Sequence, residues 1–84
     1  MGKLNVAIAD DNEVMRDLLE EMVTSDDELH LIGMAKDGEE ACHLIREKEP
    51  DVVLLDIIMP KLCGLAVIDR IRADHTLRNR TTFL

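Results

Sequence analysis

Aromatic residues are almost absent from this sequence: its 84 residues include no tryptophan, no tyrosine and one phenylalanine. Long apolar runs are absent too, because runs such as Val52–Leu55 and Ile57–Met59 are far shorter than the ~20 residues that cross a bilayer. The N-terminus lacks the charged, apolar and small-residue regions of a signal peptide. We therefore expect one small soluble domain in the cytoplasm, without a membrane contact.

Basic residues are scarce: 10 Lys and Arg stand against 18 Asp and Glu, which gives a formal net charge of −8. Nucleic-acid binding needs a basic surface, so the composition argues against direct contact of this chain with DNA or RNA. Most of the acidic residues are expected to form a solvated surface. The pair Asp10-Asp11 differs because it comes directly after an apolar run.

The residues that often bind metals through sulfur or nitrogen are few and scattered. Cys42 and Cys63 form no Cys-x-x-Cys motif, so we expect neither a disulfide framework nor a zinc site, and we predict two free thiols. His30, His43 and His75 have no partner at a ligand spacing and are interpreted as surface or packing residues.

The apolar pattern predicts strands that alternate with helices. In chain order we expect a strand over residues 4–9, a helix over 13–24, a strand over 29–35, a helix capped by Asp37 and ended by Pro50, a strand over 52–55, a helix around 65–71 and the start of a strand at 81–84. This order predicts an α/β fold with right-handed crossovers around a parallel sheet. The strand over 52–55, which is purely apolar, is expected to be central.

The helix over 13–24 is predicted by an apolar stripe at helical spacing, made of Val14, Leu18 and Met22. Apolar neighbours lie beside the stripe at Met15, Leu19 and Val23. Four methionines are interpreted as core residues; they are Met15, Met22, Met34 and Met59.

Functional side chains of a doubly wound sheet lie beyond the carboxyl ends of the strands. If the first and third strands are neighbours, Asp10 and Asp11 meet Asp56 there. Three carboxylates in one crevice repel one another, so they need a cation or a shared proton, and oxygen ligands favour Mg²⁺. In the alternative reading, Asp10 and Asp11 only cap the helix that follows. Asp56 has no such capping role for the strand before it.

The segments Ala9–Asn12 and Pro50–Pro60, followed by Gly64, resemble the receiver domain of two-component response regulators along the whole chain. This resemblance implies a flavodoxin-like, doubly wound parallel sheet. The stretch Asp56–Pro60 with Gly64–Ile68 further resembles the receivers of stage-zero sporulation regulators of spore-forming bacteria.

The resemblance implies a role for each residue of the motif. Asp56 would be the phosphoacceptor and the catalytic nucleophile, already ionised at pH 7. The metal ligands would be Asp10, Asp11, Asp56 and the backbone carbonyl of Ile58, with Mg²⁺ as the ion, or Ca²⁺ or Mn²⁺ in its place. The loop of the site would include Met59, Pro60 and Gly64.

The resemblance also implies partners and marks departures. The phosphodonor would be a phosphohistidine protein, either a histidine kinase or a phosphotransferase, and a sporulation transcription output would lie outside this chain. Receivers carry a hydroxyl residue after their fourth strand and a Lys after their fifth, and both would fall beyond residue 84. Residues 1–84 are therefore interpreted as a receiver truncated after its third helix and the start of its fourth strand. Cys63 stands where receivers commonly have Asp or Asn.

Two other function classes stay open. A phosphatase of the haloacid dehalogenase type needs a second acid two residues after the nucleophile, where this chain has Ile58, so we expect no enzyme activity beyond self-phosphorylation and dephosphorylation. The other class is an interaction fragment that self-associates through its sheet edge by exchanging residues 73–84.

Overall fold

Four parallel strands and three helices alternate along the chain in this computed structural model, which describes residues 3–77 and 81–84. The strands are β1 (Leu4–Ala9), β2 (Leu29–Ala35), β3 (Val52–Leu55) and β4 (Thr82–Phe83), and the helices are α1 (Glu13–Thr24), α2 (Gly38–Lys48) and α3 (Gly64–Ala73). The sheet order is β2-β1-β3-β4, with every neighbouring pair parallel. The predicted doubly wound α/β fold is confirmed, and β3 is an inner strand as expected.

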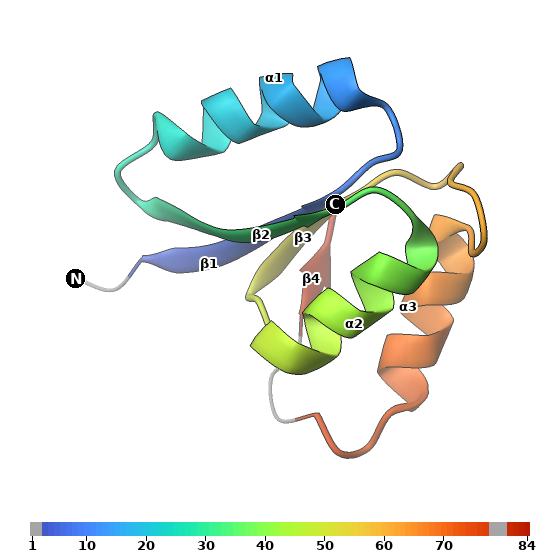
Figure 1. The fold of residues 1–84 in the computed structure, drawn as a ribbon. Coiled ribbons are helices and arrows are strands. Elements are labelled where there is room, and N and C mark those ends of the chain that lie inside the picture. Colours follow the sequence, from blue (N-terminus) through green and yellow to red (C-terminus); the bar gives the residue numbers. More distant parts are fainter. Residues whose placement is uncertain (1–2, 78–80) are drawn as a thin grey trace.

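The sheet is covered unequally on its two faces, with α1 on one face and α2 and α3 on the other (Figure 1). The core under α2 and α3 is the larger one, and its buried residues are Ala7, Ala9, Ala35, Ala41, Cys42, Ile45, Val53, Met59, Val67 and Ile71. The core under α1 holds only Val6, Ile8 and Val23, with partly buried neighbours. Residues 6–9 of β1 are all buried, because helices cover this strand from both sides.

The predicted helix over 13–24 is confirmed as α1, but the stripe that predicted it does not face the sheet. Val14, Leu18 and Met22 are 70%, 51% and 66% exposed, whereas Val23 is buried and Leu19 packs beside it. Successive helix residues are rotated by about 100°, so the face that meets the sheet lies one residue further along than the predicted stripe. Among the described elements, α1 is the single helix on this face of the sheet, so no second helix covers its outer side.

The interpretation of the methionines as core residues holds for one of four. Met59 is buried at 8% exposure, but Met15, Met22 and Met34 are exposed. The first two lie on α1, and Met34 lies on β2, which is an edge strand. Their apolar side chains are therefore not evidence of burial.

The helix ends follow the predicted signals. Asn12 Oδ1 accepts the Met15 N–H at 3.0 Å, so Asn12 is the N-cap of α1. Asp37 Oδ1 accepts the Glu40 N–H at 2.9 Å at the start of α2. That helix ends at Lys48, followed by Glu49 in the left-handed region (φ 45°) and then Pro50.

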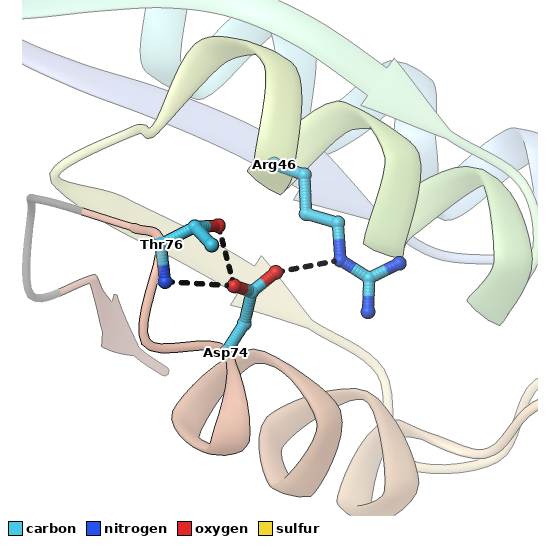
Figure 2. A network of polar contacts seen from close by, with 3 residues as sticks. All are labelled: Arg46, Asp74 and Thr76. Atoms are coloured by element: carbon cyan, nitrogen blue, oxygen red, sulfur yellow. Dashed lines mark hydrogen bonds and ion pairs between the residues drawn. The ribbon is translucent and has the colours of Figure 1, made fainter.

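A polar network joins the C-terminal end of α3 to α2 (Figure 2). Asp74 Oδ2 accepts Arg46 Nε–H at 3.2 Å, and Asp74 Oδ1 accepts the hydroxyl and the N–H of Thr76 at 2.5 and 3.0 Å. These hydrogen bonds from Thr76, together with the Arg46 charge, hold the pKa of Asp74 below its ordinary value.

The two cysteines are free thiols, as predicted. Cys42 is buried and Cys63 is exposed. Burial raises the pKa of the Cys42 thiol. None of the helices in residues 3–77 and 81–84 has the length and apolar character needed to span a lipid bilayer.

Candidate functional site

Three carboxylates meet where β1 and β3 end. The two strands are parallel neighbours, and the Asp56 N–H donates to the carbonyl of Ala9 at 2.9 Å. One carboxylate oxygen from each of Asp10, Asp11 and Asp56 lies within 4.8 Å of the other two. We call these three residues the acid cluster. The strand order brings these three side chains together, and their predicted meeting is confirmed.

Asp10 is the most constrained member of the acid cluster. It is 8% exposed, and its Oδ1 accepts the Asn12 N–H at 2.9 Å. Its own N–H donates to the Ala35 carbonyl at 3.1 Å, while its carbonyl accepts Arg16 Nη1–H at 2.8 Å. Arg16 was not predicted as part of this site, since its only signal in the sequence is a basic residue in the first turns of an acidic helix.

The alternative reading of the Asp10-Asp11 pair as helix caps does not hold, because Asn12 supplies the side-chain cap of α1. Asp11 is exposed at the rim and Asp56 is half-buried. Both are therefore available for other chemistry.

An open pocket of about 290 Å³ adjoins the acid cluster. Its wall includes Asp10 and Asp56, together with apolar residues of α1 and β3 and the C-terminal Leu84. Carboxylate oxygens beside open space suit a hard divalent cation that keeps part of its water shell, and the donor set contains no sulfur or nitrogen. The residues therefore fit Mg²⁺.

No second group of this kind occurs among the described residues: the acid cluster is the one set of at least three His, Cys, Asp or Glu side chains close enough to share an ion. His30, His43 and His75 are all exposed and do not belong to it.

The loop after Asp56 carries the other predicted site residues. Asp56 Oδ1 accepts the Ile58 N–H at 3.2 Å, and Ile58 is 81% exposed. The Gly64 N–H donates to the Ile57 carbonyl at 2.7 Å and closes the base of the loop. A Cβ at Gly64 would lie 2.5 Å from the Asp56 carbonyl oxygen, so this close approach requires glycine. Met59 anchors the loop in the core, and Pro60 is exposed.

A contact outside the acid cluster was not predicted. Lys61 Nζ lies 3.5 Å from Oδ2 of the buried Asp37. The hydrogen bond from the Glu40 N–H, aided by the Lys61 charge, holds the pKa of Asp37 below its ordinary value. The sequence marked Asp37 only as a helix cap, since nothing in it indicates that residue 61 lies beside residue 37.

Comparison with known proteins agrees with this geometry. The family model of the response regulator receiver domain matches residues 6–82. A protein-glutamate methylesterase/protein-glutamine glutaminase 1 from Syntrophomonas wolfei is 44% identical over 77 residues, which are 92% of this chain and 22% of that protein.

Solved structures show the same likeness. The response regulator domain of CheB from Thermotoga maritima has a TM-score of 0.86 at 32% identity, with 96% of this chain and 59% of that chain covered. The signal receiver domain of NarL from Mycobacterium tuberculosis has a TM-score of 0.89 at 30% identity, with coverage of 99% and 66%. A chain of the complex of CheX, CheY, BeF3 and Mg²⁺ from Borrelia burgdorferi has a TM-score of 0.81 at 32% identity, with coverage of 95% and 60%. This chain therefore spans less than two thirds of the length of each of these relatives.

Proposed function

The chain belongs to the response regulator receiver domain family, and we propose that it accepts a phosphoryl group on Asp56 with the help of a divalent metal ion. The observation that carries this proposal is the meeting of Asp10, Asp11 and Asp56 within 4.8 Å. Asp56 follows an inner strand directly, so its carboxylate is held at the sheet edge by the backbone of β3.

In the proposed transfer, a carboxylate oxygen of Asp56 attacks the phosphorus of a phosphohistidine donor. The new O–P bond makes an acyl phosphate, the N–P bond breaks, and the donor imidazole keeps the electron pair and takes up a proton. Asp56 needs no general base, because an ionised carboxylate is already a nucleophile. The hydrogen bond from the Ile58 N–H to Asp56 Oδ1 fixes one oxygen and leaves the carboxylate oriented for attack.

The proposed metal ligands are Asp10, Asp11, Asp56 and the carbonyl of Ile58, with Mg²⁺ as the ion, or Ca²⁺ or Mn²⁺ in its place. Bound Mg²⁺ supplies charge neutralisation of the transferring phosphoryl group. The oxygen-only donor set supports this choice. The similar chain from Borrelia burgdorferi belongs to a complex that contains Mg²⁺, which supports the same ion here.

The output of the module is a separate proposal. The resemblance at Asp56–Pro60 supports a sporulation transcription output, whereas the curated relative named above is a methylesterase. In either case the output would lie outside residues 1–84, which we propose form a receiver up to its fourth strand.

A second candidate function is self-association as an interaction fragment. Its support is the short edge strand β4 and the exposure of Leu84, which is 72%. Exchange of residues 73–84 between two chains would then join them.

Incubation with a phosphorylated histidine phosphotransferase, with and without Mg²⁺, tests the proposed transfer. The chain should gain phosphate only when Mg²⁺ is present, and Asp56→Asn should gain none. Asp69→Asn, which removes an exposed acid of α3, is the matched control and should react like the unmodified chain. Equal phosphate gain by Asp56→Asn would refute the assignment.

A further inference from the structure

The loop between Asp56 and α3 is fixed at its base and in its middle. Its base is the hydrogen bond from the Gly64 N–H to the Ile57 carbonyl, at 2.7 Å. Its middle is the side chain of Met59, which is 8% exposed in the core. The tip of the loop, Pro60–Leu62, lies beyond these two anchors, and its Leu62 is partly buried against the same core.

The tip is a tight turn in an unfavourable backbone conformation. The Leu62 N–H donates to the Pro60 carbonyl at 2.7 Å, and Lys61 between them has φ 67°. This hydrogen bond across one residue with a positive φ is the pattern of a γ-turn, which is rare and strained. Such a conformation persists only when the surrounding structure holds it.

The N-terminal end of α2 provides that support. The Gly38 N–H donates to the Pro60 carbonyl at 3.4 Å, and Asp37 Oδ2 pairs with Lys61 Nζ at 3.5 Å. The backbones are in close contact here, because a Cβ at Gly38 would lie 1.9 Å from the Leu62 carbonyl oxygen. The turn therefore lies directly on Gly38.

The ion pair fixes position more than it adds stability. The side chain of Asp37 is 6% exposed, and its other oxygen already accepts the Glu40 N–H at 2.9 Å, so this carboxylate cannot move freely. The side chain of Lys61 is 60% exposed, and exposed ion pairs contribute little to the free energy of unfolding. The contact gives the turn a rigid partner at small energetic gain.

We propose that Asp37 and Gly38 are positioning residues for the metal site, because they hold the Pro60–Leu62 turn and thereby orient the carbonyl of Ile58. Ile58 lies two residues before the turn and is 81% exposed, so its own side chain does not anchor the backbone there. The backbone on its two sides is fixed by the hydrogen bond from the Gly64 N–H to the Ile57 carbonyl and by the buried Met59, and the turn after Met59 completes this frame. The proposal rests on the proposed function, since it takes the Ile58 carbonyl as a metal ligand.

The test is the Mg²⁺ dissociation constant of variants, measured by titration calorimetry at a temperature where each variant is folded. Gly38→Ala should weaken Mg²⁺ binding by roughly tenfold, as loss of groups that orient metal ligands commonly does. Lys61→Met should weaken Mg²⁺ binding by a smaller factor. Lys61→Arg, which keeps the charge, should bind Mg²⁺ like the unmodified chain. Global stability does not enter this measurement, so a merely structural role would leave the dissociation constant unchanged.

Two matched controls separate this effect from the substitutions themselves. Gly33→Ala also adds a methyl group, but its close neighbour is the flexible end of Leu44, at 2.6 Å. Lys48→Met also removes one charge, from an exposed lysine 4.0 Å from Glu47. Both controls should bind Mg²⁺ like the unmodified chain.

The outcomes distinguish this inference from the proposed function. If Asp11→Asn loses Mg²⁺ binding while Gly38→Ala and Lys61→Met keep it, the positioning role is overturned and the acid cluster remains a metal site. If the unmodified chain binds no Mg²⁺, both proposals fail. If Gly38→Ala does not fold, the comparison of Lys61→Met with Lys61→Arg decides, because weak binding by both or by neither contradicts the role of the ion pair.

Discussion

Ala9 lies opposite Leu55 in the parallel pairing of β1 with β3, so the next residue of each strand, Asp10 and Asp56, emerges at the same edge of the sheet. This register brings together carboxylates that are 46 positions apart in the chain. The acid cluster is therefore a property of strand order, because its three carboxylates come from the ends of two strands and the turn that carries Asp11.

Mg²⁺ should stabilise the fold by relieving repulsion within the acid cluster. A ligand that binds only the folded state at about ten times its dissociation constant adds about 1.4 kcal/mol to the free energy of unfolding. Asp11→Asn should lose most of this gain, yet be more stable than the unmodified chain without metal, because one of three mutually repelling charges is gone. Melting curves with and without Mg²⁺ measure both effects. Asp17→Asn, which changes an exposed acid on α1, is the control, and an equal Mg²⁺ response of Asp11→Asn would exclude Asp11 as a ligand.

Cys63→Asn should stabilise the chain. Cys63 is the N-cap of α3 and has the extended backbone of a cap, but its side chain makes no capping hydrogen bond. An Asn side chain can accept a backbone N–H of the first turn, which is worth about 1 kcal/mol. The urea midpoint should rise for Cys63→Asn and stay nearly unchanged for Cys63→Ala. A fall in the midpoint for Cys63→Asn would show that the loop cannot accept a cap.

Stability should fall in acid because of Asp37 and Asp74. The pKa of each is lower in the folded chain than its ordinary value, so the folded state favours the charged form. Their contribution is present above the unfolded-state pKa and is lost as the pH falls through the folded-state pKa, which places the loss below about pH 4. The urea midpoint at pH 6 and pH 3 measures it.

Asp74→Asn provides the check on this assignment. This variant should show a smaller drop in the urea midpoint between pH 6 and pH 3, because Asn cannot lose a charge there. The exposed Asp27→Asn should keep the full drop. The same drop in Asp74→Asn and the unmodified chain would mean that the Arg46–Asp74–Thr76 network does not contribute to acid sensitivity.

Self-association is expected at micromolar concentration through the edge beside β4 and exchange of residues 73–84. Phe83 is half-buried against the core of its own chain, whereas Leu84 is 72% exposed. Leu84→Asp is therefore a better probe than Phe83→Asp, because it changes a largely exposed side chain rather than one packed against the core. Light scattering after size exclusion should show an oligomer for the unmodified chain and a smaller species for Leu84→Asp. A monodisperse monomer of the unmodified chain would contradict the prediction.

The sequence was sufficient to predict the elements that place the acid cluster. The apolar runs before Asp10 and Asp56 predict strands, because strands buried on both faces are largely apolar and end where charge begins. The same logic located α2 between its cap at Asp37 and Pro50.

The rest depended on tertiary contacts that a local pattern does not contain. The apolar residues of α1 surround much of the helix, so their spacing could not show whether Leu18 or Leu19 faces the sheet. The contact of Lys61 with Asp37 joins residues of two loops, and neither residue type in isolation indicates the other. Charge at position 61 is an ordinary surface feature until the fold brings it to a buried carboxylate.

The phosphoacceptor role of Asp56 is tested most directly by locating the phosphoryl group with tandem mass spectrometry. After incubation with acetyl phosphate and Mg²⁺, the chain should carry one phosphoryl group, on the peptide that contains Asp56 and on that residue within it. Omission of Mg²⁺ should abolish the modification. The reaction should be slow for residues 1–84, because loss of one electrostatic contact of the kind implied for a lysine beyond residue 84 costs ~10²–10³ in rate. A phosphoryl group on any other residue, or equal modification without Mg²⁺, would contradict the proposed role of Asp56.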